Sequence, residues 1–234
     1  MKDRIVRVLA ENGTECGDEQ AGKLSLYLDL LLEENRKTNL TAITDKEKAV
    51  VLHAADSILA SRFIPRGKLL DIGSGAGLPA VPLAVMREDV AVTALDATEK
   101  KTAFIARASR ELGLGNLTVM TGRAEELGRD PRFREQFDSV TARAVARLDV
   151  LCELALPFVR VGGVFVALKG KDAGEELRLA QNAAAALGGS VSDFAVPLNG
   201  GEPGIVRHVV VVKKISPCPA EYPRRYSKIK SAPL

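Results

Sequence analysis

Three glycines at alternate positions, Gly73, Gly75 and Gly77, follow an apolar stretch at residues 69–72 and precede an apolar helical stretch at residues 81–86. A strand, a glycine turn and a helix in this order are typical of the first unit of nucleotide-binding α/β folds. Glycine suits such a turn because it adopts backbone angles that other residues resist and lets a ligand approach the main chain. The pattern predicts a ligand contact at all three glycines; the alternative is an ordinary tight turn.

The spacing of these glycines favours S-adenosyl-L-methionine (SAM) over a dinucleotide. Dinucleotide-binding folds use G-x-G-x-x-G and hold a pyrophosphate at the helix N-terminus. Here the spacing is G-x-G-x-G, and Asp71 precedes the first glycine. A carboxylate at this strand end would attract an ammonium group and repel a pyrophosphate. Since SAM carries an ammonium and a sulfonium but no phosphate, we expect SAM as the cofactor, with S-adenosyl-L-homocysteine (SAH) as its product.

A second acid, Asp96, ends the β-rich stretch at residues 90–96. It lies at about the 20-residue offset at which such folds place a carboxylate on the ribose hydroxyls. A carboxylate can accept both hydrogen bonds of a cis-diol. We therefore predict that Asp96 contacts the ribose; the alternative is an acid that stabilises the N-terminus of the helix after Thr98.

Strand-like and helix-like stretches alternate from residue 68 onward, which predicts a mostly parallel sheet. Beyond the elements already named, we expect strands at 117–121, 137–142 and 163–168 and helices at 98–112, 149–160 and 172–187.

The last two strand-like stretches, at residues 191–196 and 207–213, are joined by a Gly/Pro segment that is too short for a crossover helix, so they should pair antiparallel. The sequence therefore predicts an α/β fold of the SAM-dependent, class I, Rossmann-like methyltransferase type. Its sheet would have seven strands, mostly parallel, with an antiparallel terminal hairpin.

The predicted methyltransferase domain spans residues 63–214 and follows an N-terminal helical extension at residues 1–62. In this extension, apolar residues repeat at helical spacing. The residues expected to face the core are Leu24, Tyr27, Leu28, Leu31 and Leu32 in a first helix, and Val50, Val51, Ala54 and Ile58 in a second helix at residues 45–60.

The remaining residues, 215–234, form a basic, Pro-containing C-terminal tail. Prolines should keep it extended, as an arm that contacts RNA phosphates. The alternative is a solvated, poorly ordered terminus.

Composition narrows the function classes. Aromatic residues make up 4% of the chain and Trp is absent, which argues against an RNA binder built on aromatic stacking. The net charge is only +3, so any nucleic-acid contact must be local. The three cysteines, Cys16, Cys152 and Cys218, lie far apart without metal-ligand spacing. We expect a cytoplasmic monomer with reduced thiols, no metal and no membrane contact.

Several segments together resemble the bacterial 16S rRNA guanine-N7 methyltransferases of the RsmG family, also called GidB. The most specific strings are Asn-Leu-Thr-Ala-Ile-Thr at residues 39–44 and Thr-Ala-Arg-Ala-Val-Ala-Arg at residues 141–147. Other matching segments are 53–57, 71–79, 123–125 and 167–170. The resemblance covers nearly the whole chain and ends in the tail, where Tyr222-Pro-Arg-Arg225 is followed by residues unlike the family's.

The resemblance implies SAM contacts at Gly73, Leu78, Ala124, Glu125 and Arg143. A backbone N–H at Ala124 or Glu125 would suit an adenine nitrogen, although Ala-Glu-Glu-Leu is also good helix-start sequence. Arg143 follows a strand, where its guanidinium could bind the SAM carboxylate or an RNA phosphate.

The partner that the resemblance implies is 16S rRNA, free or within the small ribosomal subunit. The candidate RNA contacts are Arg143, Arg147, Lys169, Arg224 and Arg225.

The implied reaction is methyl transfer from SAM to N7 of a guanosine. Because N7 has a free lone pair, the reaction needs no dedicated general base, and catalysis should come from in-line positioning. The roles of Asn39, His53 and Asp56 stay open, since a histidine on a helix is more often packed than catalytic. Two other functions stay open: methylation of a small molecule, and a SAM-sensing RNA-binding protein without activity.

Overall fold

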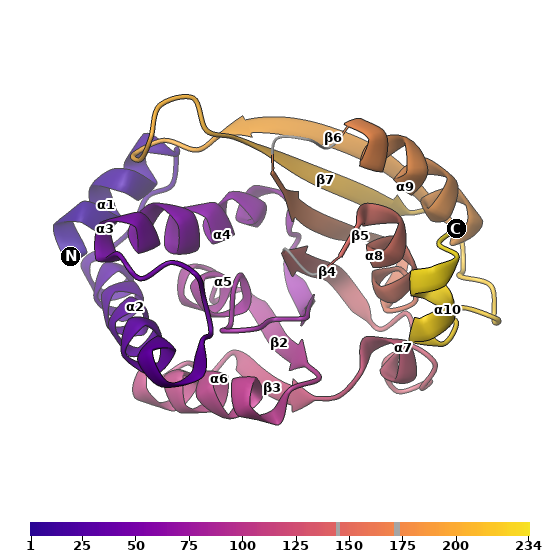
Figure 1. Cartoon of the computed structure of the whole chain (residues 1–234), viewed down its shortest axis with the longest axis horizontal. Coiled ribbons are helices and arrows are strands. Elements are labelled where there is room, and N and C mark those ends of the chain that lie inside the picture. The colour runs from indigo at the N-terminus through magenta and orange to yellow at the C-terminus, as the bar shows by residue number, and fades with distance from the viewer. Residues whose placement is uncertain (144–145, 171–173) are drawn as a thin grey trace.

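The computed structural model describes the backbone of residues 1–143, 146–170 and 174–234. These residues form a seven-stranded sheet with the strand order β3-β2-β1-β4-β5-β7-β6 (Figure 1). Strands β1 to β5 pair in parallel, whereas β7 is antiparallel to both β5 and β6. The predicted fold class and the terminal hairpin are confirmed. The strands are β1 (Gly67–Ile72), β2 (Val90–Asp96), β3 (Leu117–Thr121), β4 (Phe137–Arg143), β5 (Val159–Lys169), β6 (Gly189–Pro197) and β7 (Val206–Lys214).

Helices cover both faces of this sheet. The helices that precede β1 in the chain are α1 (Lys2–Glu11), α2 (Asp18–Thr38), α3 (Lys46–Ala49), the π-helical η1 (Val50–Ala55), α4 (Asp56–Ile58) and the 3₁₀-helical η2 (Leu59–Phe63). Those of the later chain are α5 (Ala80–Met86), α6 (Glu99–Glu111), α7 (Ala124–Leu127), α8 (Leu148–Ala155), α9 (Gly174–Ala186) and α10 (Tyr226–Ser231).

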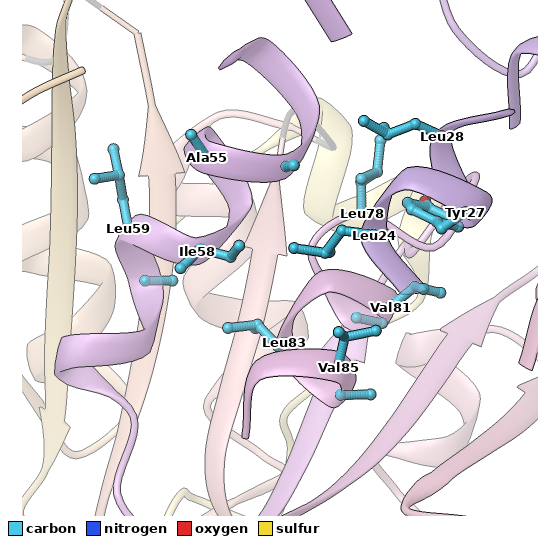
Figure 2. Packing of buried hydrophobic residues seen from close by; sticks show 14 of the residues in the cluster. Leu24, Tyr27, Leu28, Ala55, Ile58, Leu59, Leu78, Val81, Leu83 and Val85 are labelled. Carbon is cyan, nitrogen blue, oxygen red and sulfur yellow. The ribbon is translucent and has the colours of Figure 1, made fainter. Parts of the chain in front are cut away.

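Alternation along the strands divides the core into two layers. In β1, Leu69 belongs to a cluster with the N-terminal helices, α5 and α6, whereas Leu70 and Ile72 belong to a cluster with α8, α9 and α10. Figure 2 shows part of the first cluster, in which α2 and α4 pack against α5. The apolar residues predicted to face the core in residues 24–32 and 50–58 are all buried there.

One helix prediction is wrong at its end. Helix α8 stops at Ala155, and Val159 and Arg160, expected in that helix, begin β5. Gly163, expected to open the strand, lies inside it with Gly162, at a register shift against β4. A Cβ on Gly163 would lie 2.6 Å from the Asp138 carbonyl oxygen, so glycine here marks a close strand approach, not a boundary.

Two further predictions concern the later chain. The expected start of the last helix, at residue 172, lies outside the described residues, and α9 is described from Gly174 onward. The tail was expected to be extended, but residues 226–231 form α10 beside α8 (Figure 1). The tail folds back because Ile229 is fully buried in the second cluster.

In the described parts of the chain, no helix combines the length and apolar character that crossing a membrane requires.

Candidate functional site

The glycine turn lies where the strand order reverses. Strand β1 has β2 on one side and β4 on the other, and in such sheets ligands bind in the crevice at the carboxyl ends of the two diverging strands. Gly73 and Gly75 have φ values of 67° and 59°, in the left-handed region that favours glycine. A Cβ on Gly75 would meet only the Gly73 carbonyl oxygen, at 3.9 Å, so this part of the turn is open.

Gly77 has a different reason to be glycine. Its φ is 93°, and a Cβ there would lie 2.7 Å from Cγ2 of Val81. It therefore permits the first turn of α5 to pack closely. Next to it, the buried Tyr27 hydroxyl donates a hydrogen bond to the Ala76 carbonyl oxygen at 2.8 Å. Helix α2 thus holds the turn from the N-terminal side, a role that the sequence did not indicate.

Asp96 connects the turn to the end of β2. Its Oδ2 accepts a hydrogen bond from the Gly75 amide and its Oδ1 accepts one from the Thr98 amide, both at 2.9 Å. The carboxylate is mostly buried yet lines two neighbouring cavities. A carboxylate can accept more than two hydrogen bonds, so Asp96 can brace the turn and still bind a ligand.

Asp71 lies beneath the turn, not in the wall of either cavity. It is fully buried, and its Oδ1 accepts a hydrogen bond from the Thr141 hydroxyl at 3.0 Å. Burial raises the pKa of this carboxyl to about 7. Asp71 therefore joins the ends of β1 and β4. Because it lines neither cavity, it is not placed for the direct contact with an ammonium group that was expected at this strand end.

The first cavity, of about 360 Å³, lies over the turn. Its floor comes from Gly73 to Ala76 and Leu78, and Asp96 and Arg143 stand at its sides. The N-terminal segment closes it with Leu40, Thr41 and His53. Leu40 and Thr41 follow Asn39, which ends α2 in a left-handed conformation with φ of 49°. Asn39 is exposed and shapes the chain at this point.

The second cavity, of about 230 Å³, lies on the other side of Asp96. Ile72, Leu95 and Leu154 give it an apolar wall, and Ala124 and Glu125 line its edge. The helix start is confirmed, because α7 begins at Ala124, and its first-turn amides have no intrahelical acceptors. Tyr226 of α10 also lines this cavity.

A third cavity, of about 340 Å³, adjoins the first and shares Arg143 and His53 with it. Asp56 lies in its wall between two arginines. Oδ2 of Asp56 accepts from Arg143 at 3.2 Å and Oδ1 accepts from Arg207 at 2.7 Å. Arg143 also donates to the Leu52 carbonyl oxygen at 2.9 Å. The buried carboxylate therefore fixes both guanidinium groups in the cavity wall.

His53 is held as a neutral ring. Its Nδ1 lies 3.2 Å from the Leu52 carbonyl oxygen, which can only accept, and its Nε2 lies 2.9 Å from the Thr41 hydroxyl. That hydroxyl accepts from the Ile43 amide and can donate to Nε2. Burial and the nearby Arg143 lower the pKa of His53 to about 4. The ring is thus packed and uncharged at neutral pH.

The other predicted RNA contacts differ in exposure. Lys169 lines the third cavity, where its Nζ donates to the Ala146 carbonyl oxygen at 3.0 Å and pairs with Glu176 at 2.6 Å. Arg147 is 57% exposed and pairs with Asp149. Arg225 is exposed. The fifth residue, Arg224, is mostly buried and pairs with the carboxylate of Glu153.

Several cavity residues were not predicted from the sequence. Arg207 is brought to the site only by the antiparallel return of β7, and Tyr226 only by the folding back of the tail. Leu52 directly precedes the matched segment 53–57, and Thr41 lies within the string at residues 39–44, where the sequence assigned no role to it. The motif residues Ala144 and Val145 lie outside the described residues.

The fold resembles that of known methyltransferases. An O-methyltransferase from Bacillus cereus, in complex with SAH, superposes with a TM-score of 0.57 at 19% identity, over 81% of this chain and 91% of that one. The fibrillarin pre-rRNA processing protein of Methanococcus jannaschii gives a TM-score of 0.53 at 18% identity, over 69% and 74%. These likenesses support the class I SAM methyltransferase fold.

Sequence comparison is more specific. A relative from Thermoanaerobacter sp. (strain X514), ribosomal RNA small subunit methyltransferase G, is 38% identical over 100% of both chains. The enzyme of the same name from Exiguobacterium sibiricum is 42% identical over 100% of this chain and 99% of its own. The family described as rRNA small subunit methyltransferase G (GidB) matches residues 20–205. The chain therefore belongs to the rRNA small subunit methyltransferase G family.

Proposed function

We propose that this protein transfers the methyl group of SAM to N7 of a guanosine in 16S rRNA, without a dedicated general base. As a member of its family it is a SAM-dependent methyltransferase of small-subunit rRNA. The position of the methyl group and the mechanism are the parts that we add. The observation that carries them is the pair of adjoining cavities that share Arg143 and His53.

The first two cavities fit the two ends of SAM. Asp96 lines both, which supports a contact between its carboxylate and the ribose diol that joins the methionine end to the adenine end. We assign the methionine end to Gly73, Gly75, Leu78 and Arg143, because the turn is open at Gly75 and a guanidinium is a donor for the carboxylate of SAM. When bound, SAM supplies an electrophilic methyl group on a sulfonium.

We assign the adenine end to the second cavity. Its apolar wall suits the faces of a purine, and the first-turn amides at Ala124 and Glu125 suit its ring nitrogens. Gly77 is not part of this assignment, since its close contact with Val81 explains the glycine there without a ligand.

The third cavity fits the acceptor guanine. Arg143, Lys169 and Arg207 are hydrogen-bond donors in its wall, and the O6 atom of guanine is an acceptor. A donor that binds O6 orients the base and leaves the lone pair of N7 free to attack the methyl group. Because the wall residues Arg143 and His53 also line the first cavity, a base in the third would lie next to the methyl-donor end.

The charges in this wall agree with a reaction that releases no proton from the acceptor. Each oxygen of Asp56 accepts a hydrogen bond from a guanidinium group, so both oxygens already have partners within the wall. His53 is neutral, but its Nε2 lone pair is directed at the Thr41 hydroxyl. In this proposal the residues that line the cavity orient the base, and positioning is the source of rate enhancement.

The RNA backbone would be held by the exposed cations around this site. Arg147 and Arg225 are the exposed members of the predicted set, and Lys169 reaches the acceptor cavity. Contacts of this kind position the nucleic acid and make its binding sensitive to salt.

The test is transfer of labelled methyl from SAM to 16S rRNA and to small subunits prepared from cells that lack this protein, followed by digestion and mass spectrometry. We expect a single N7-methylguanosine. A methyl group on another atom or another base would refute the assignment of the acceptor. An absence of transfer to every form of the rRNA would refute the proposed function.

A further inference from the structure

We propose that the C-terminal segment 218–234 completes the adenine cavity, and that the Tyr226 ring stacks on the adenine. The inference rests on the proposed function in one respect, the assignment of the adenine to the second cavity. Tyr226 is the first residue of α10 and lines that cavity together with residues of β1, β2 and α8. The residue is 39% exposed, so part of it is uncovered and available to a ligand.

A buried ion pair fixes the position of this segment. Glu153 on α8 is fully buried, and its Oε1 accepts hydrogen bonds from both the backbone amide and Nε of Arg224, each at 2.8 Å. The Arg224 side chain is 17% exposed. Because a buried carboxylate binds main chain and side chain together, the residue two positions before Tyr226 is held against α8.

Two further arginines bind the carbonyl groups of the same segment. Arg129 donates from Nε to the Pro223 carbonyl oxygen at 2.7 Å, and Arg134 donates to those of Cys218 and Tyr222 at 2.8 and 2.7 Å. These side chains come from the loop that follows α7, the helix that begins at the edge of the cavity. The segment is therefore attached to both elements that frame the adenine site.

Beyond Tyr226, Ile229 anchors the other end of α10. It has no exposed surface and packs in the cluster that contains Leu154 of α8 and Leu156, which follows that helix. Leu154 is the neighbour of Glu153 and also lines the cavity. The same helix thus contributes an apolar wall residue, holds Arg224 and supports Ile229, so Tyr226 is fixed on both sides in the chain where it lines the cavity.

Stacking is the interaction that this arrangement offers. A purine has two π faces, and an aromatic ring that covers one of them stabilises binding without reading the edge of the base. Tyrosine is suited to a half-exposed wall because its ring is apolar and its hydroxyl can stay in water. The C-terminal segment then carries both an exposed cation and a cofactor contact, since Arg225 directly precedes Tyr226.

The experiment measures SAH binding by calorimetry in the full chain, without RNA. We expect Tyr226→Ala to raise the Kd for SAH by about 5- to 150-fold, the range of base–aromatic stacking. Tyr226→Phe should bind within about twofold of the original protein because it keeps the ring. Lys228→Ala is the matched control, since Lys228 is exposed on the same helix and does not line the cavity.

Tyrosine fluorescence gives a second readout that a structural role alone would not change. The chain has three tyrosines and no tryptophan, so tyrosine emission is not masked. SAH should quench this emission in the original protein, and the quenching should disappear in Tyr226→Phe although SAH still binds.

Equal affinity of Tyr226→Ala and Lys228→Ala would overturn the proposal, as would a loss in Tyr226→Phe as large as that in Tyr226→Ala. Failure of the proposed function looks different: the original protein would bind SAH but form no N7-methylguanosine.

Discussion

Replacement of Asp96 by Asn tests the centre of the proposed cofactor site. The carboxylate accepts one hydrogen bond on each oxygen, from the amides of Gly75 and Thr98, and lines both SAM cavities. Asn keeps the shape but has only one acceptor oxygen and carries no charge. It can satisfy one of the two amides, and its NH₂ group then faces the other amide or the ligand.

The magnitude follows from the hydrogen bonds that are lost. A hydrogen bond to a charged group contributes about 1.5–3 kcal/mol, which corresponds to about a 10- to 150-fold rise in the Kd for SAH. The unliganded protein should also lose about 1–2 kcal/mol of unfolding free energy, because one amide of the turn is left without its acceptor. The two effects are measured separately, by calorimetry with SAH and by urea denaturation without it.

Glu99→Gln is the control because it makes the same change of charge at an exposed position a few residues away. We expect this variant to bind SAH as the original protein does. If Asp96→Asn lost stability but bound SAH as tightly as the Glu99→Gln control, Asp96 would only brace the turn and the ribose contact would be refuted.

Four more outcomes are expected. Gly77→Ala should lower the unfolding free energy by about 1–3 kcal/mol in urea, because a side chain at φ of 93° is strained and would overlap α5; unchanged stability would contradict the packing role. Glu153→Gln should cost about 3 kcal/mol by leaving the Arg224 guanidinium without its counter-ion, and a loss below about 1 kcal/mol would mean that the pair behaves as a surface one. His53 has a folded-state pKa of about 4 against an ordinary 6.5, so between these two pH values the unfolded chain binds more protons than the folded one. Stability should therefore fall by up to about 3 kcal/mol between pH 6.5 and 4, and His53→Gln should lack this part of the loss. Arg225→Ala should reduce the slope of log K against log salt for RNA by about 0.7 and leave SAH binding unchanged; an equal slope would remove Arg225 from the RNA contacts.

The strands and the first site residues were predictable because their signals are local. Strands β2 and β3 have the predicted bounds, since each is a β-rich stretch with a polar end. Gly75 and Asp96 could be paired from the sequence because a parallel strand, a helix and a second strand have nearly fixed lengths. The structure adds what spacing could not give, a direct hydrogen bond between the Gly75 amide and the Asp96 carboxylate.

The predictions that failed or were missing depend on contacts between distant parts of the chain. Gly163 looked like a boundary, but the approach of β4 puts it inside β5. The tail looked extended from its prolines, but the burial of Ile229 favours a helix. Arg207 carries no local signal, because only the pairing of β7 with β5 brings its side chain to Asp56.

The N-terminal helices are part of the site, not only a cover for the sheet. Tyr27 of α2 holds the glycine turn through the Ala76 carbonyl group, and Asp56 of α4 holds Arg143 and Arg207 in the wall of the third cavity. Thr41 and His53 close the cavity between these two points. A parallel sheet supplies the turn and the acid at its carboxyl edge, but the donors that would orient a base are fixed from outside the sheet. The strings at residues 39–44 and 53–57 therefore lie beside the cavity that we propose for the acceptor base, on a fold that many methyltransferases share.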